Sequence, residues 1–142
     1  MSLNITLTGA DVLWPDGPEM RDLHLADGRV TDAPAGRSVD LSGYMILPGI
    51  VDIHGDGFER HLAPRRGAMK DVDQGLIATE AELAANGITT ATLAQFYSWE
   101  GGMRGPEFAE KVFAGLATIR PQVDTDLLVQ LRFETPMLDD YA

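Results

Sequence analysis

The chain has 142 residues and carries 11 basic against 22 acidic side chains, a formal net charge of −11. With 44% hydrophobic residues it suits one domain of ordinary size, and no stretch approaches the roughly 18 apolar residues of a membrane span. The absence of cysteine excludes disulfides and thiolate chemistry, so any metal must be held by His, Asp, Glu or carbonyl oxygen. The acidic balance argues against a nucleic-acid partner. Because the N-terminus lacks a secretory signal pattern, we expect a soluble, cytoplasmic protein without membrane association.

The sequence pattern of the first 45 residues predicts a small β unit made of short strands and turns. Two signals fix the turns: the cluster from Trp14 to Pro18, and Asp27-Gly28, a two-residue hairpin sequence. Alternating or short apolar runs predict the strands, at 4–8, 11–14, 21–26, 29–31 and 38–41.

From residue 45 onward the pattern changes to strands that alternate with helices. The predicted strands are 50–54, 88–93 and 126–134, and the predicted helices are 71–86 and a second one that begins near Pro106. Gly87 stands where a helix C-terminal cap belongs, and Pro121 ends the second helix. Such alternation predicts an α/β fold with a parallel sheet and right-handed crossovers.

Polar side chains recur along two of these strands. Alternation places Asp52, His54 and Asp56 on one face of the first strand, with Val51 and Ile53 on the other. In the third strand Gln130, Arg132 and Glu134 share a face, opposite a row of apolar residues. We therefore expect both strands to turn apolar residues toward helices and polar residues toward a common interior. These polar residues sit at the carboxyl ends of their strands, where parallel α/β folds keep their active sites.

His54 and Asp56 offer one nitrogen and one carboxylate ligand to a hard or borderline divalent metal. The alternative is a histidine and an aspartate at a loop start that hydrogen-bond to the backbone. Glu134 is either a third ligand or a salt-bridge partner of Arg132. The residue pattern alone leaves these alternatives open.

Arginines follow the first strand in FERH, residues 58–61, and PRRG, residues 64–67. They could grip phosphate or carboxylate groups through bidentate hydrogen bonds, or form a solvated basic loop in an acidic protein. The chain contains neither the G-x-G-x-x-G fingerprint at a helix start nor a G-x-S-x-G elbow, so no catalytic residue is assigned from motifs.

Residues 40–54, DLSGYMILPGIVDIH, resemble the amidohydrolase superfamily, whose members run from a small β-sandwich segment into the first strand of a barrel. The continuation HGDGFERHLAPRRG, with NGITTA at 86–91 and LRFE at 131–134, resembles the phosphonate-metabolism branch. The resemblance implies a β-sandwich segment over 1–47 and, over 48–142, the first three β/α units of a TIM-barrel-like, metal-dependent hydrolase.

In that branch a His-x-Asp pair, matching His54 and Asp56, replaces the usual His-x-His, and the glutamate of its LR-x-E strand matches Glu134. The resemblance therefore implies a divalent metal, usually zinc, that lowers the pKa of a bound water. The resulting hydroxide would release diphosphate from a ribose 1-phosphonate 5-triphosphate. The candidates for holding this anionic substrate are Glu59, Arg60, His61, Arg65 and Arg132.

Two other functions fit the same residues. The chain departs from the branch at Gly57-Phe58, where Asn-Leu is usual, so a hydrolase of C–N bonds in a cyclic amide is an alternative.

Because a complete barrel takes about 250 residues, we expect the N-terminal part of a longer enzyme that is inactive alone. A third reading is a non-catalytic module whose open strand edge pairs with a partner or with a second copy in a homo-oligomer.

Overall fold

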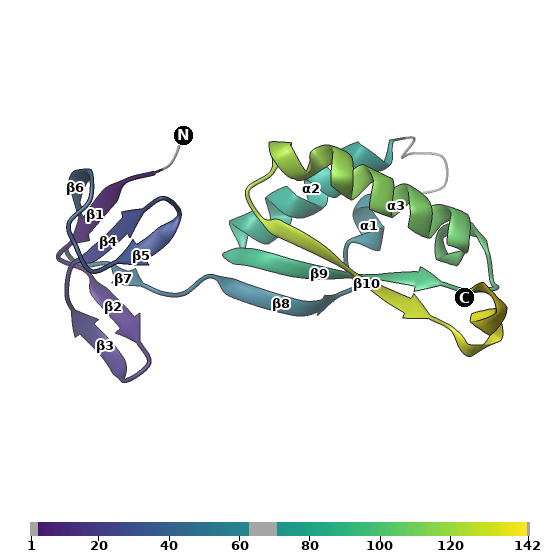
Figure 1. Ribbon diagram of the computed structural model, residues 1–142, viewed down its shortest axis with the longest axis horizontal. Coiled ribbons are helices and arrows are strands. Elements are labelled where there is room, and N and C mark those ends of the chain that lie inside the picture. The colour runs from purple at the N-terminus through teal and green to yellow at the C-terminus, as the bar shows by residue number, and fades with distance from the viewer. Residues whose placement is uncertain (1–2, 63–70, 142) are drawn as a thin grey trace. The chain divides into compact units, whose positions relative to one another are not determined.

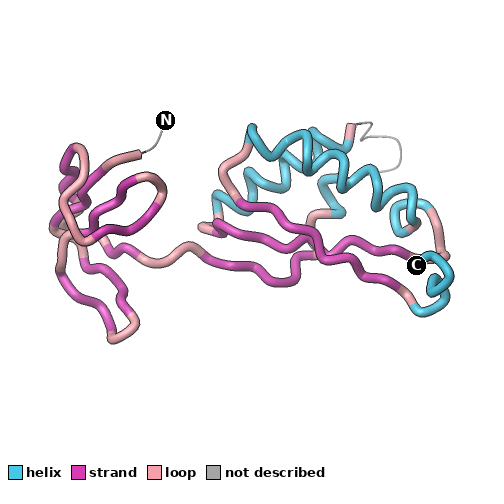
Figure 2. Tube along the Cα trace, in the orientation of Figure 1, coloured by secondary structure: helices cyan, strands magenta, loops and turns pink. Residues whose placement is uncertain are grey.

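The computed structural model describes residues 3–62 and 71–141, and the chain divides into two compact units, Met1–Pro48 and Gly49–Ala142 (Figure 1). Strands and connecting loops make up the first unit, whereas the second alternates strands with helices (Figure 2). This mixed architecture confirms the α/β class expected from the sequence. Membership of a TIM-barrel-like fold stays a prediction, because within the described residues the sheet of the second unit has the three expected strands and no more.

The first unit contains two small sheets. The four-stranded sheet has the order β5 (Arg29–Thr31), β4 (Leu23–Ala26), β1 (Ile5–Thr8) and β6 (Arg37–Asp40). The three-stranded sheet has the order β3 (Gly17–Met20), β2 (Asp11–Trp14) and β7 (Met45–Ile46). In both sheets a distant strand, β6 or β7, pairs in parallel with a strand of an antiparallel pair.

The turns of this unit follow from their residues. Asp27 and Gly28 both have positive φ, 51° and 74°, which is the geometry of a type I′ hairpin and confirms the predicted turn between β4 and β5. The cluster at 14–18 forms a tighter turn than we expected, because Gly17 and Pro18 already belong to β3. Pro18 is tolerated there because β3 is an edge strand.

The second unit is a parallel sheet with the order β10 (Asp126–Phe133), β9 (Ile88–Tyr97) and β8 (Ile50–Gly55). Helices α2 (Val72–Ala85) and α3 (Pro106–Ile119) cover one face of it (Figure 1). A short helix, α1 (Glu59–Leu62), follows β8, and 3₁₀ turns lie at Gly102–Arg104, Arg120–Gln122 and Thr135–Asp140. Among the described residues, no helix combines the length and the apolarity needed to cross a membrane.

Capping residues set the bounds of the two long helices. The Asp71 side chain accepts a hydrogen bond of 2.9 Å from the Asp73 N–H at the start of α2. Gly87 adopts a φ of +76° just beyond its end, and Pro106 occupies the first turn of α3. These positions confirm the helix limits predicted near them.

The core lies between the sheet and the helices. Leu76 of α2, Leu93 of β9 and Val112 of α3 are all at most 1% exposed. Fully burying one such side chain stabilises the fold by about 1.5–3 kcal/mol. Their packing holds β9 at the centre of the sheet and leaves β8 and β10 at its two edges.

The prediction for the faces of β8 was wrong for Val51 and Ile53 but is confirmed for His54, whose ring is hydrogen-bonded to Gln130 of β10, one of the polar residues expected to share its interior. The register with β9 shifts between Asp52 and Gly55, so three steps along β8 match two along β9, a β-bulge. The register also shifts between Ile50 and Val51, so strict alternation fails on both sides of Asp52. Val51 and Ile53, expected to face the helices, are 60% and 75% exposed. In β10 the expectation is confirmed at Leu127 and Val129, which pack in or against the core.

Candidate functional site

The carboxyl ends of the three parallel strands bring polar side chains to one edge of the sheet. Glu59 follows β8, Ser98 follows β9 and Glu134 follows β10. The backbone joins two of these ends, because the Glu134 N–H donates to the Tyr97 carbonyl oxygen over 3.2 Å. We call this edge, with the segment 98–104, the carboxyl edge. Parallel α/β folds place their reactive groups here because the loops that follow the strands converge.

Ser98 and Glu134 form the shortest polar contact at the carboxyl edge. The Ser98 Oγ–H donates to Glu134 Oε2 over 2.6 Å, and Ser98 is completely buried. In the described part of the chain Glu134 makes no ion pair with Arg132, which was one of the two alternatives considered for it. One carboxylate oxygen of Glu134 is thus held, and no side-chain hydrogen bond is made by Oε1 among the described residues.

Two arginines flank a single aromatic ring near this edge. The Arg132 guanidinium lies 4.0 Å from the Phe96 ring centroid, and that of Arg104 lies 4.4 Å from it. Arg104 also donates to Glu100 Oε2 over 2.7 Å, and this hydrogen bond is the main reason that its pKa is raised. The nearby carboxylates of Glu59 and Glu134 raise the same pKa further. The carboxyl edge therefore combines carboxylates with guanidinium groups.

Two buried acceptors on these segments have no hydrogen-bond partner among the described residues: Glu59 Oε1 and Gln95 Oε1. Gln95 is fully buried in β9, and its Nε2 already donates to the carbonyl oxygens of Phe96 and Met103. If the Gln95 amide were flipped, its oxygen would face the carbonyl oxygens of Phe96 and Met103 and lose both hydrogen bonds. Leaving a buried acceptor unpaired lowers the stability of the fold by about 1–3 kcal/mol. Unpaired buried acceptors in native proteins are therefore often found at functional sites.

The predicted metal ligands do not gather at one point. His54 Nδ1 is hydrogen-bonded to Gln130 Oε1, and Gln130 lies four residues before Glu134 on β10. Four residues of strand span about 13 Å. Within residues 3–62 and 71–141, no three His, Asp or Glu side chains lie close enough together to hold a metal ion.

His54, Asp56 and Glu134 are donors of the types that zinc accepts, but their arrangement does not fit a three-ligand centre. The bulge explains part of this outcome. Asp52 lines a pocket with residues of α1 and α2, whereas His54 contacts β10, so the two residues expected to share a face do not. The metal site over these three residues stays a prediction, and no chemical step below depends on it.

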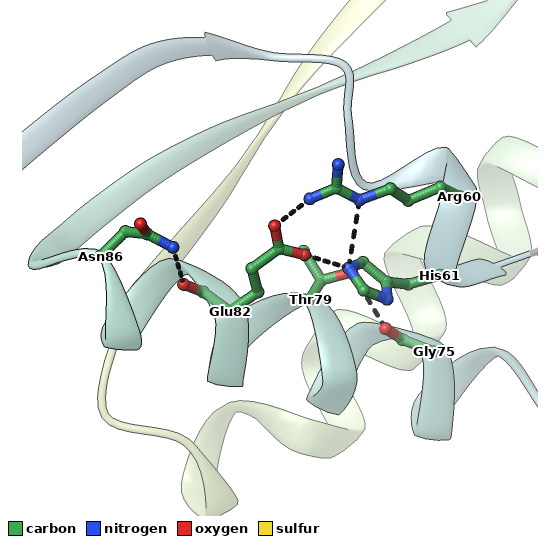
Figure 3. Close-up of polar contacts among 6 residues, drawn as sticks. All are labelled: Arg60, His61, Gly75, Thr79, Glu82 and Asn86. Carbon is green, nitrogen blue, oxygen red and sulfur yellow. Dashed lines mark hydrogen bonds and ion pairs between the residues drawn. The ribbon is translucent and has the colours of Figure 1, made fainter.

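Arg60 and His61 of α1 lie against α2, where both contact Glu82 (Figure 3). Arg60 binds Glu82 Oε1 and His61 Nε2 binds Glu82 Oε2. The hydrogen bond from His61, followed by that from Arg60, lowers the pKa of Glu82. In this structure the partner of both side chains is thus a carboxylate of the chain itself, and the three residues fasten α1 to α2.

These three residues border a pocket of about 140 Å³ between β8, α1 and α2. Its wall combines charged groups with apolar ones, among them Asp52, Phe58 and Leu93. The role predicted for Arg60 and His61, holding an anionic substrate, stays a prediction, as does that of Arg132. Arg65 lies outside the described residues.

Sequence reasoning missed Ser98, Gln95 and Arg104. Ser98 and Arg104 follow the predicted second strand, where the sequence assigned no reactive residue, and Gln95 lies beyond the predicted end of that strand at 93. The one signal that could have identified the region was the length of the second strand, which continues to Tyr97. Because β9 extends to Tyr97, the Ser98 hydroxyl lies beside the end of β10.

Comparisons with known proteins give short matches. The chain is 33% identical over 60 residues to an allantoinase from Deinococcus radiodurans, a match that covers 38% of this chain and 13% of the relative. It is also 33% identical over 57 residues to a D-hydantoinase from Rhizobium radiobacter, covering 37% of this chain and 12% of that enzyme. Each match therefore spans about an eighth of the relative's length. No family model matches the sequence.

Among solved structures, an uncharacterized protein matches with a TM-score of 0.46 and 14% identity, over 93% of this chain and 32% of that one. The two curated relatives are both hydrolases of the amidohydrolase superfamily. Neither carries the name of a diphosphatase or of a phosphonate enzyme. Partial sequence similarity thus links this chain to amidohydrolases whose names refer to cyclic amides.

Proposed function

We propose that this chain is part of a hydrolase that opens a cyclic amide by cleaving a C–N bond. The observation that carries the proposal is the 33% identity to both an allantoinase and a D-hydantoinase. Because these relatives act on C–N bonds, they favour the cyclic-amide alternative over release of diphosphate from a phosphonate substrate. The activity belongs to the whole protein, since the match covers about an eighth of each relative.

The carboxyl edge has groups suited to this chemistry. In the proposed reaction a water oxygen attacks the ring carbonyl carbon, and the water proton passes to Glu134 Oε1. The C–N bond then breaks, the leaving nitrogen takes that proton, and the new carboxyl group on the former carbonyl carbon releases the second water proton to solvent to become a carboxylate. A positioned carboxylate accelerates such proton transfers by about 10²–10⁴-fold.

Cationic groups near Glu134 would stabilise the negative charge that develops on the carbonyl oxygen. Arg132 and Arg104 lie on the Phe96 ring, with guanidinium distances of 4.0 and 4.4 Å to its centroid. Arg104 already donates to Glu100. Contact with a ring face leaves guanidinium N–H groups at the rim able to donate in a fork, which suits Arg132 to this role. Arg132 is therefore the proposed substrate-binding residue that the structure supports best.

The test is an assay of the protein in the length in which its source cells make it. The substrates are allantoin, a 5-substituted hydantoin and a ribose 5-triphosphate, each with and without added zinc. We expect ring opening of at least one cyclic amide and no release of diphosphate. Glu134→Gln should lower ring opening by about 10²-fold or more. Diphosphate release without ring opening would overturn the proposal in favour of the phosphonate branch.

A further inference from the structure

Ser98 is held rigidly by the segment that follows β9. Its N–H donates to the Arg104 carbonyl oxygen over 2.8 Å, which closes the segment 98–104 into a loop. Its Oγ accepts the N–H of Glu100 over 3.1 Å. With that acceptance in place, the single hydroxyl proton of Ser98 is directed to Glu134 Oε2, 2.6 Å away. Both hydrogen-bonding roles of the hydroxyl are thus assigned.

The loop that holds Ser98 is itself anchored to the sheet. The fully buried Gln95 donates from Nε2 to the Met103 carbonyl oxygen over 3.1 Å. A second tie joins the two sides of the loop, because Arg104 Nη1 donates to Glu100 Oε2 over 2.7 Å. These hydrogen bonds fix the loop that carries Ser98, so the orientation of Ser98 needs no reorganisation when a substrate binds.

Resting on the proposed function, we propose that Ser98 is a positioning residue for Glu134. Its hydroxyl fixes Oε2 and thereby presents Oε1 to the attacking water. The backbone contribution is independent of this role, since the Glu134 N–H is held by the Tyr97 carbonyl oxygen. Removing the hydroxyl should therefore free the carboxylate to rotate while the main chain stays in place. Partners that orient a reactive group typically contribute about 10–100-fold to activity.

The kinetic test uses the full-length protein and four variants. Ser98→Ala should lower kcat for ring opening by about 10-fold or more and leave KM within about twofold. Ser98→Thr, which keeps a hydroxyl, should recover most of kcat. In a Glu134→Gln background, Ser98→Ala should cause no further loss, because the two residues act as one unit. An equal loss in both backgrounds would overturn the proposal.

A matched control removes another buried hydroxyl at the opposite end of the sheet. Thr125, 5% exposed, donates from Oγ1 to the Ile88 carbonyl oxygen over 3.3 Å. Thr125→Val should leave kcat unchanged. If Thr125→Val lowers kcat as much as Ser98→Ala does, the effect is a general one of lost packing, and the positioning role is refuted.

Crystal structures of the unsubstituted protein and of Ser98→Ala separate this inference from the proposed function. We expect the Glu134 carboxylate to turn in the variant while the backbone of 98–104 keeps its course. A carboxylate that stays in place without Ser98 overturns the inference even if the enzyme opens cyclic amides. A protein that opens no cyclic amide refutes the proposed function, whereas a turned carboxylate still supports the control of Glu134 by Ser98.

Discussion

The two edge strands of the parallel sheet, β8 and β10, look alike in sequence and differ in structure. Each alternates apolar with polar residues and ends in a carboxylate-bearing segment. In β10 the alternation holds as far as Val129, with Leu127 5% exposed, whereas Leu131, expected on the same face, is 39% exposed. In β8 a bulge interrupts it, and Ile53 is 75% exposed. Alternation thus predicts which residues share a face only where each strand residue matches one residue of its neighbour.

The two strands also differ in what secures their carboxyl ends. After β8, α1 is joined to α2 by the contacts of Arg60 and His61 with Glu82. At the end of β10, Phe133 stacks on Tyr97 and meets the edge of Tyr141. One end therefore depends on charge and the other on aromatic packing, so acid should weaken the first more than the second.

The largest expected effect is a difference in stability between the two strands. Leu127→Ala should lower the free energy of unfolding by about 2–5 kcal/mol, because it leaves a cavity in the core. Val51→Ala should change it by less than about 0.5 kcal/mol, because Val51 is 60% exposed. Urea unfolding of both variants measures the difference. Equal losses would mean that β8 is covered in solution in the same way as β10.

A smaller effect is expected where α1 packs on α2. A Cβ at Gly75 would lie 2.8 Å from both the His61 carbonyl oxygen and Leu62 Cδ2. Gly75→Ala should therefore cost about 1–3 kcal/mol through overpacking. Gly57→Ala is the control, since nothing lies within 4 Å of the added methyl group. Thermal unfolding compares the two, and similar midpoints would argue against the close approach of α1.

The aromatic contacts at the end of β10 are expected to contribute as much or less, because Tyr141 is 75% exposed. The rings of Phe133 and Tyr97 lie 5.0 Å apart, and those of Phe133 and Tyr141 lie 5.4 Å apart. Phe133→Leu keeps an apolar side chain but removes both ring contacts, each worth about 0.5–1.5 kcal/mol. Urea unfolding followed by near-ultraviolet circular dichroism measures the loss. An unchanged aromatic signal would show that the rings are not ordered against each other.

The smallest effect concerns acid. The pKa of Glu82 lies below its ordinary value of 4.5 because of His61 first and Arg60 second. A carboxyl whose pKa is lower in the folded state stabilises the fold above the unfolded value, and this stabilisation is lost as the pH falls through the folded value. Glu82→Gln should thus flatten the dependence of the urea midpoint on pH below 4.5. Glu110→Gln, on the exposed face of α3, should leave that dependence unchanged.

Most elements of the fold could be predicted because their signals are local. Asp27-Gly28 specifies its turn through positive φ angles, and Asp71 and Gly87 mark the ends of α2. The bulge in β8 could not be predicted, because it depends on how Asp52 and Gly55 match β9. Helix α1 was missed as well, since four residues carry no periodic pattern.

The candidate site was predicted in its location but not in its contacts. Glu134 lies at a strand end, as its place after an alternating run indicated. Its partner Ser98 is 36 residues away, and the two meet only because β9 and β10 pair in one particular register. His54 was expected beside Asp56 and Glu134, yet it contacts Gln130. Side-chain partners across strands depend on register, which residue spacing alone does not specify.

The pairing distances along the chain also bear on the order in which the molecule folds. In the hairpin of β4 and β5, Ala26 faces Arg29, so its loop closes almost at once, within about 1–10 μs. Ile50 of β8 faces Ile88 of β9, 38 residues later, and the strands can meet only after α2 has spanned the gap. Contacts this distant slow folding. Pulse-labelling hydrogen exchange should therefore detect protection in the hairpin first, and the carboxyl edge, which needs all three strands, should be completed last.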